Sequence, residues 1–144
     1  MKIHRIETGK VRIKKNQVQK SQGIQPKMMK VLFGKEWSDW LPIYAWVIEH
    51  PEGIFVVDTG ETHRTGQKGY FPKWHPYYGL AVEFDVAPND EIGPKMKAMG
   101  IDPETDVDKV IMTHLHTDHA GGMHHFPNTE FLIDRKEYQT ASGW

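Results

Sequence analysis

The stretch Val110–His125 reads VIMTHLHTDHAGGMHH and carries the strongest structural signal in the chain. Residues 110–113 are apolar or β-branched, which predicts a buried strand. Gly121 and Gly122 allow the backbone to turn tightly a few residues later. Between the strand and the glycines lie four side chains of the kinds that bind metal ions: His114, His116, Asp118 and His119. We therefore expect a strand that delivers metal ligands at its end.

The spacing of these four residues predicts a site for two ions. Imidazole and carboxylate groups together suit zinc and the neighbouring transition metals. If the strand period continues past Thr113, the side chains of His114 and His116 project to the same side and share one ion. Asp118 and His119 come after the strand, where the turning chain brings them to a second ion.

A histidine-rich loop that merely sequesters metal is the alternative, because five histidines fall between positions 114 and 125. The preceding strand, Asp118 and the glycine pair favour an organised site over that alternative. His124 and His125 lie outside the spacing, and we interpret them as solvated helix residues, not as ligands.

The pattern His-x-His-x-Asp-His at a strand end resembles the signature of the metallo-β-lactamase superfamily, and residues 114, 116, 118 and 119 match it position for position. The resemblance implies an α/β fold, the first half of a metallo-β-lactamase-like αββα sandwich. It also implies two divalent metal ions, with zinc expected and iron, manganese and cobalt as alternatives.

The same resemblance implies further ligands, namely a third histidine, a bridging aspartate and a fourth histidine. None of them can be identified after His125, the last histidine of the 144 residues. We therefore expect residues 1–144 to be the N-terminal part of a single domain that is truncated. One face of its sheet would then lack its partner layer and expose apolar surface, which favours aggregation.

Other elements follow from local patterns. Asn89–Met99 has helical apolar spacing with Gly100 after it, and Asp134 with Glu137 predicts the start of another helix. Met28–Phe33 is interpreted as a strand or an irregular buried segment. Four strands and two hairpins are expected: strands at Leu41–Glu49, Ile54–Asp58, Lys109–Thr113 and Glu130–Ile133, a hairpin that turns at His50–Gly53, and another within residues 2–13 that turns at Thr8-Gly9.

Asp58 closes an otherwise apolar strand and begins the triplet Asp58-Thr59-Gly60. It can simply start the next turn. The superfamily resemblance implies a more specific role, because members often carry Asp-x-Gly at the strand end beneath the metals. There the carboxylate orients a ligand imidazole without touching the metal, and we favour this role because a ligand histidine needs its other nitrogen fixed.

Residues 61–86 show no sustained period and are rich in aromatic side chains. A loop of this length within a domain is usually functional. Its aromatic residues could line an apolar substrate pocket, or they could cover the core edge or a subunit interface, so a homodimer is left open. The candidates for the pocket are Phe71, Trp74, Tyr77 and Tyr78.

The composition excludes several classes of protein. Hydrophobic residues make up 38% and charged residues 26%, and the net charge is -1, so no electrostatic case for nucleic-acid binding arises. There is no cysteine, which excludes disulfides and thiolate ligands. The first residues lack an apolar signal segment and no run approaches a membrane span, so we expect no membrane partner and a cytoplasmic location.

The resemblance implies hydrolysis by a hydroxide that two metal ions activate. Asp118 is then the catalytic residue, because it binds the second ion, positions the hydroxide and passes a proton to the leaving oxygen. His116 stands where the diiron flavoprotein branch usually has a glutamate, which disfavours redox chemistry.

Leu41-Pro42, Val57–Gly60 and THLHTDHAGG at residues 113–122 together resemble the quorum-quenching branch that opens N-acyl homoserine lactones. Thr117 departs from the apolar residue that some lactonases carry there, which puts its contact with the acyl chain in doubt. The expected partner is a small-molecule ester or lactone. The alternatives are a glyoxalase II-like thioesterase, another hydrolase of the same fold, and an inactive metal-binding half-domain, since activity of these residues alone is left open.

Overall fold

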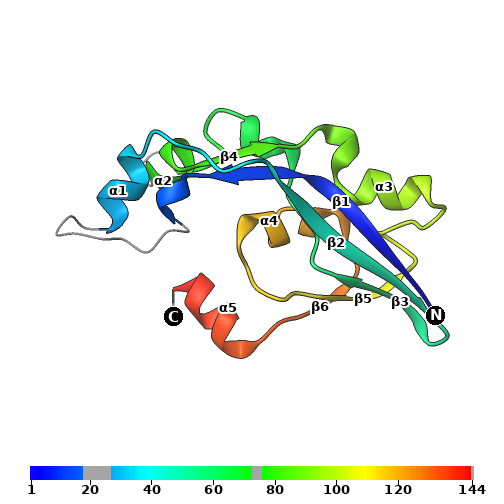
Figure 1. Ribbon diagram of the computed structural model, residues 1–144. Coiled ribbons are helices and arrows are strands. Elements are labelled where there is room, and N and C mark those ends of the chain that lie inside the picture. The colour runs from blue at the N-terminus through cyan, green and yellow to red at the C-terminus, as the bar shows by residue number, and fades with distance from the viewer. Residues whose placement is uncertain (18–26, 73–75, 144) are drawn as a thin grey trace.

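The computed structural model describes residues 1–17, 27–72 and 76–143 (Figure 1). In this part of the chain six strands form one sheet in the order β4-β1-β2-β3-β5-β6. The strands are β1 (Lys2–Ile13), β2 (Leu41–His50), β3 (Gly53–Val57), β4 (Val82–Asp85), β5 (Val107–Ile111) and β6 (Glu130–Leu132). The α-helices are α1 (Lys27–Phe33), α2 (Pro76–Leu80), α3 (Ile92–Ala98), α4 (Thr117–Ala120) and α5 (Arg135–Ser142). Short 3-10 turns are η1 (Lys15–Gln17), η2 (His63–Gly66), η3 (Pro88–Asp90) and η4 (Met123–His125).

The sheet is mixed, and its parallel half positions the candidate site. β2 and β3 form the expected antiparallel hairpin, whereas β3 with β5 and β5 with β6 pair in parallel. Parallel neighbours have their carboxyl ends at the same edge of the sheet, where the following loops gather. The expected α/β class is confirmed, and the loops after β3, β5 and β6 lie at one edge.

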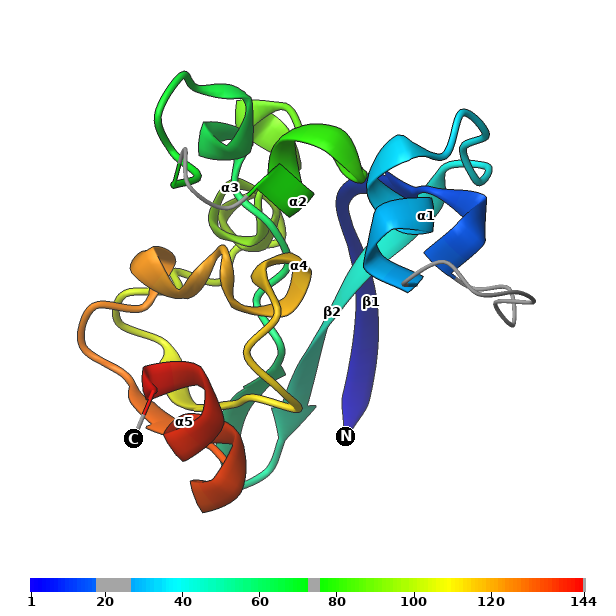
Figure 2. The ribbon, with the colours of Figure 1, turned by 90° about the vertical axis from the view of Figure 1, so that its left-hand side faces the viewer.

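The core lies on one face of the sheet, beneath α3 and α4. Figure 2 shows both helices on the same side of β1 and β2. Val47, Val56 and Val110 point to this side from β2, β3 and β5 and are fully buried. Ile92 and Met96 of α3 are also fully buried, because their spacing of four residues places them on one side of the helix.

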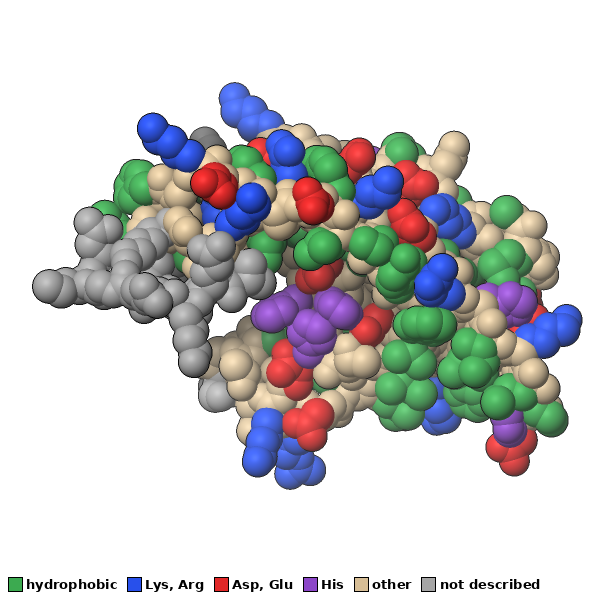
Figure 3. Space-filling view, viewed as in Figure 1, with side chains coloured by type: hydrophobic (Ala, Val, Ile, Leu, Met, Phe, Trp, Pro, Cys, Tyr) green, Lys and Arg blue, Asp and Glu red, His purple; other side chains and the backbone are tan. Residues whose placement is uncertain are grey.

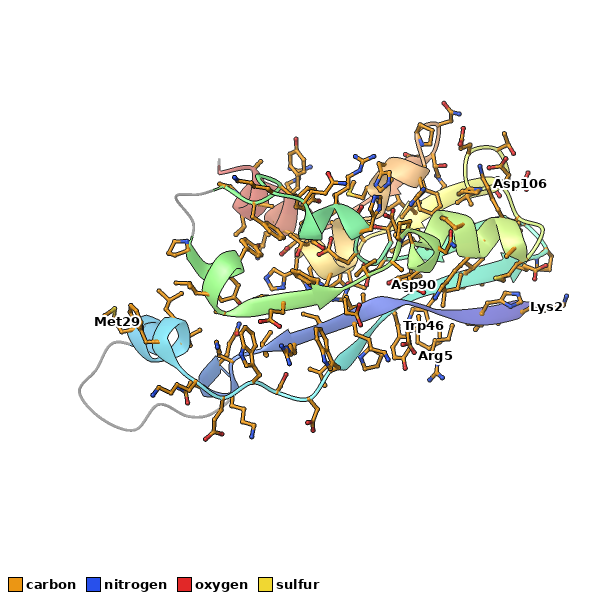
Figure 4. All side chains as sticks on the ribbon, turned by 90° about the horizontal axis from the view of Figure 1, so that it is seen from above. Lys2, Arg5, Met29, Trp46, Asp90 and Asp106 are labelled. Atoms are coloured by element: carbon orange, nitrogen blue, oxygen red, sulfur yellow. The ribbon has the colours of Figure 1, made fainter. Side chains whose placement is uncertain are left out.

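The opposite face of the sheet is apolar and partly exposed. Trp46 pairs with Val57, Val57 with Ile111, and Ile111 with Leu132, so these side chains form a row across four strands. Figure 4 shows Trp46 and its neighbour Arg5 on the side of the sheet away from α3. Hydrophobic side chains gather over β2, β3 and β5 in Figure 3.

Three local predictions are wrong. Residues 61–86, expected to form a loop, contain η2, α2 and β4. β1 is one continuous strand instead of a hairpin, and its register shifts between Glu7 and Lys10. The glycine that would have turned the chain, Gly9, lies in a bulge with φ 118°, because β1 continues on to pair with β4. Residues 27–33 form α1 and not a strand, in keeping with the high helix propensity of methionine, lysine and leucine.

Both expected helices are present. α3 is followed by Gly100 at φ 82°, the left-handed position predicted for the residue after the helix. The Asp134 side chain caps α5 by accepting hydrogen bonds from the backbone N–H groups of Lys136 and Glu137. Across residues 1–17, 27–72 and 76–143, no helix has the length and apolar character needed to cross a membrane.

Candidate active site

The metal motif lies on the segment that connects β5 to α4. β5 ends at Ile111, two residues earlier than the strand predicted from the sequence, so His114 and His116 lie beyond the strand. Asp118 and His119 belong to α4. The loop after β3 lies beside α4, since the N–H of Thr59 donates a hydrogen bond to the carbonyl of His119 over 2.7 Å.

His114 and His116 lie together as predicted, but they do so in the segment after β5 and not through the alternation of side chains along a strand. Nε2 of His114 lies 3.1 Å from Nδ1 of His116, and the ring centroids are 4.7 Å apart. Two nitrogens at this separation can both bind one ion at the usual distance of about 2 Å. Burial and the neighbouring imidazoles hold the pKa of His114 below its ordinary value, which favours the neutral ring that binds metals.

Asp118 and His119 form a second pair beside the first. Oδ2 of Asp118 lies 3.6 Å from Nε2 of His119, and the His119 ring centroid is 3.9 Å from that of His114. Figure 3 shows histidine side chains gathered at one place on the surface with acidic side chains beside them. The donor set of the two pairs, three imidazoles and one carboxylate, therefore fits two neighbouring divalent ions of the zinc class.

Asp58 lies directly behind His119. Its Oδ2 is 2.8 Å from Nδ1 of His119, and its Oδ1 accepts hydrogen bonds from the backbone N–H and the hydroxyl of Thr113. Burial alone would raise the pKa of Asp58, but these hydrogen bonds outweigh burial and lower it. The same contact raises the pKa of His119. The Asp58 carboxylate thus occupies Nδ1 of His119 and leaves Nε2 as the ring nitrogen that can bind a metal ion.

Two glutamates that were not predicted as site residues bond to the segment that carries the motif. Oε1 of the fully buried Glu61 accepts a hydrogen bond from the backbone N–H of Thr62, and its carboxyl group bonds the side chain of Thr117. Oε2 of Glu61 has no hydrogen-bond partner among the described residues. Burial raises the pKa of Glu61 to about 7. Glu137 of α5 accepts a hydrogen bond from the backbone N–H of Leu115 over 3.0 Å.

A cavity of about 510 Å³ opens beside the motif. His116, Thr117 and Asp118 form its polar end. Its other walls come from β1, β2, β4, η1 and α2, and they are mostly apolar: Val11, Ile13, Gln17, Leu41, Tyr77, Tyr78, Val82 and Phe84. This size lies within the usual range of small-molecule pockets, about 300–1,000 Å³.

The four aromatic residues singled out from the sequence occupy different places. Tyr77 and Tyr78 line the cavity, and the hydroxyl of Tyr77 accepts a hydrogen bond from the side chain of Gln17. Phe71 stacks on Tyr78 with ring centroids 4.2 Å apart, and it lines a separate hollow of about 320 Å³. Trp74 lies outside the described residues.

A second histidine group, which the sequence analysis missed, meets at the buried Glu91. His63, His124 and His125 all contact its carboxylate, so His124 and His125 are not merely solvated, although both lie in the short helix η4 and His124 is exposed as predicted. Burial would raise the pKa of Glu91, but hydrogen bonds from His63, His125 and Thr62 lower it to about 2. No local spacing marks this group, because Glu91 is more than thirty residues from either His124 or His125.

Comparison with known proteins gives consistent matches. Residues 38–140 match the family model of the metallo-beta-lactamase superfamily. The N-acyl homoserine lactonase AttM of Azorhizobium caulinodans is 28% identical over 142 residues, which are 98% of this chain and 48% of AttM. An N-acyl homoserine lactonase of a Bacillus species is 37% identical over 106 residues, covering 70% of this chain and 40% of that protein.

The solved structures agree with the sequence matches. One is an N-acyl homoserine lactone hydrolase with the product N-hexanoyl-L-homoserine bound at its catalytic metal centre. It superimposes with a TM-score of 0.77 at 27% identity, covering 97% of this chain and 51% of that one. The chain thus spans about half the length of the proteins it matches.

Proposed function

Because the chain belongs to the metallo-beta-lactamase superfamily, we propose that it provides the first metal-binding motif of a hydrolase that opens N-acyl homoserine lactones. The two pairs of ligand side chains and the mostly apolar cavity beside them support this proposal. The activity belongs to the protein of which these residues form the N-terminal part of a single domain.

In this proposal His114 and His116 hold one divalent ion, and Asp118 and His119 hold a second. Zinc is the proposed ion, since imidazole and carboxylate donors suit it. When bound, the two ions lower the pKa of a water molecule and polarise the carbonyl group that it attacks. Asp58 keeps the His119 ring in place through its 2.8 Å contact with Nδ1.

Asp118 is the proposed catalytic residue. Its carboxylate is half-buried at the polar end of the cavity, so it can reach both an attacking water and the substrate. It orients the water, accepts its proton and returns that proton to the ring oxygen when the carbon–oxygen bond of the lactone breaks. The product is the ring-opened N-acyl homoserine.

The cavity is the observation that best supports an N-acyl lactone as the substrate. Its polar end at His116 and Asp118 suits the lactone ring, and its apolar walls suit an acyl chain. Thr117, also at the polar end, has a hydroxyl where some lactonases have an apolar side chain.

The test is hydrolysis of N-hexanoyl homoserine lactone by the zinc-loaded native protein. We expect the Asp118→Asn variant to be at least about 100-fold slower, because it loses the proton acceptor. Asp102→Asn, which changes an exposed aspartate in the loop before β5, is the matched control and should keep full activity. Equal rates for Asp118→Asn and Asp102→Asn would refute the proposed mechanism.

Two further measurements separate the alternatives. A thioester such as S-lactoylglutathione, assayed beside the lactone, identifies a glyoxalase II-like enzyme if it is the better substrate. The intact mass and zinc content of the protein from its native source identify a half-domain, if the mass is that of 144 residues and hydrolysis is absent. Two zinc ions in a chain about twice as long, with lactone hydrolysis, support the lactonase.

A further inference from the structure

We propose that Glu91, His124 and His125 form an additional binding site for a divalent cation of the zinc class, separate from the motif at residues 114–119. Their ligating atoms all lie within 4.8 Å of one another. One carboxylate and two imidazoles are a donor set typical of zinc sites that keep an open position. This proposal is independent of the proposed hydrolase function.

The three side chains converge on a single oxygen atom. Oε2 of Glu91 lies 2.6 Å from Nε2 of His125 and 3.2 Å from Nε2 of His124. The Glu91 side chain is only 2% exposed, whereas His124 is open to solvent. The cluster is thus closed at the carboxylate and accessible from the His124 side, which gives a cation a path of entry.

The hydrogen bond at Nδ1 of His124 determines which nitrogen of the neutral ring carries the proton. Nδ1 of His124 lies 3.1 Å from the backbone carbonyl of Gly121. A carbonyl oxygen can only accept, so Nδ1 carries the proton. In the neutral ring, Nε2 then presents a lone pair to the negatively charged Glu91 carboxylate. A cation between these two acceptors removes their repulsion, and the carbonyl orients the ring as in known zinc sites.

The remaining ligands are held in place by contacts outside the cluster. Oε1 of Glu91 accepts hydrogen bonds from the Thr62 hydroxyl and the His63 backbone N–H, both over 3.0 Å. The His125 ring lies against the backbone of Gly93, where an added Cβ would come within 2.4 Å of its Nδ1. The carboxylate and the His125 ring are therefore ordered before any cation binds, which lowers the entropic cost of binding.

A cation at this site would join two elements that are distant in sequence. Glu91 is the residue that precedes α3, and His124 and His125 belong to η4, which is separated from α4 by two glycines. Gly122, at the start of η4, donates a hydrogen bond to the carbonyl of Gly60 near the end of β3. Binding should therefore raise the thermal stability of the protein, since the unfolded chain lacks the site.

The experiment uses the whole protein in a background that lacks part of the motif, His116→Ala with Asp118→Asn. Zinc is titrated against a chromophoric chelator, and the melting temperature is recorded with and without zinc. Binding at the proposed site leaves one zinc ion per chain in this background, together with a zinc-dependent rise in melting temperature.

Two further substitutions, each made in this background, test whether the remaining ion is bound at the proposed site. His124→Asn keeps a side-chain donor for the Gly121 carbonyl but removes Nε2, and His125→Asn likewise removes Nε2. Each should weaken zinc binding at least about tenfold. His4→Asn is the matched control, because Nε2 of His4 also lies 2.6 Å from a glutamate oxygen, in the Glu49 pair between β1 and β2.

The proposal is overturned if the folded background variant binds no zinc. It is also overturned if His124→Asn and His125→Asn bind the remaining ion as tightly as His4→Asn does. Circular dichroism of each variant shows whether it is folded, and a variant that fails to fold is replaced by its glutamine counterpart. None of these readouts depends on lactone hydrolysis, so the proposed function can fail while this site stands.

Discussion

Oδ2 of Asp58 lies 2.8 Å from Nδ1 of His119, and this contact joins the end of β3 to the helix that carries half of the metal motif. Asp58 is the one described residue other than glycine with a positive φ, at 56°. Its left-handed conformation turns the chain after β3 and places the carboxylate beneath His119. Aspartate and asparagine tolerate this conformation better than most residues.

Replacing Asp58 by asparagine should weaken zinc binding by about 10–100-fold. Asparagine keeps the backbone conformation, but it removes the negative charge beside His119 and cannot accept hydrogen bonds from His119 and Thr113 as a carboxylate does. The measurement is a zinc titration of the native protein and the variant.

Asp108→Asn is a suitable control for this experiment. Asp108 also accepts a backbone hydrogen bond between neighbouring strands, from the N–H of Ile54 over 2.8 Å, but it lies at the start of β5. Its substitution should leave zinc affinity unchanged. If both variants bind zinc equally well, Asp58 does not orient a ligand.

Substitution of Gly60 by alanine should destabilise the protein by more than about 3 kcal/mol. Gly60 has φ 70°, and an added Cβ would lie 2.0 Å from the hydroxyl oxygen of Thr8, which is fully buried in β1. Gly100→Ala is the control, since Gly100 has φ 82° but no atom lies within 4 Å of an added Cβ. The free energy of unfolding of that variant should fall only by the cost of the left-handed conformation, about 1–2 kcal/mol. Urea unfolding measures both, and equal losses would show that the Thr8 contact relaxes.

The raised pKa of Glu61 should make stability depend on pH. The pKa of Glu61 is about 7 in the folded protein, because of burial, and about 4.5 in the unfolded chain. The folded state therefore binds more protons between these values, and the free energy of unfolding falls as pH rises from about 4 to about 7. A difference of about 2.5 pKa units corresponds to an upper limit of about 3 kcal/mol.

Glu61→Gln mimics the protonated side chain and should remove the fall in the free energy of unfolding between about pH 4 and pH 7. We expect the variant to match the native protein near pH 4 and to exceed its stability near pH 8. Unfolding in urea with a chelator present measures both proteins without metal. Glu104→Gln, at an exposed position, should retain the native pH dependence. A native pH profile for Glu61→Gln would mean that Glu61 ionises normally in the folded protein.

A larger side chain at Leu41 should shorten the acyl chains that the proposed lactonase accepts. Leu41 lines the cavity and is 47% exposed, so tryptophan can fill the space without disrupting the core. We expect Leu41→Trp to slow hydrolysis of N-decanoyl homoserine lactone about tenfold and to leave the N-butanoyl substrate nearly unaffected. An equal effect on both substrates would show that the acyl chain of the substrate does not lie in this cavity. Phe33→Trp, far out on α1, is the control.

Local sequence signals were sufficient for the parts of the site that are close in sequence. The spacing of residues 114–119 predicts the two pairs of side chains that lie together, and Asp134 predicts the start of α5, because both depend on residues a few positions apart. Asp58 could be assigned a place beneath the metals only through the resemblance, since its contact with His119 spans 61 residues.

The features that sequence reasoning missed depend on long-range packing. The turn signal Thr8-Gly9 is shared by hairpins and bulges, and the pairing of β1 with β4 decides between them. Glu91 meets His124 and His125 only because α3 and η4 pack together over the sheet. Nothing in the spacing of these residues distinguishes them from charged residues that face solvent.

The apolar row on the outer face of the sheet should make these 144 residues bind hydrophobic dyes and self-associate. Trp46, Ile111 and Leu132 are 38–41% exposed, and Val57 of β3 lies between Trp46 and Ile111 in this row of four strands. Substituting Trp46 and Ile111 together by threonine places β-branched residues at both strand positions and removes two of the four apolar side chains of the row, so dye fluorescence should fall by about half. Phe33→Gln removes a single apolar side chain, 68% exposed on α1, and should change little because it is not part of the row. A native chain that unfolds sharply and reversibly on heating, with little dye bound, would mean that this face does not need a partner layer.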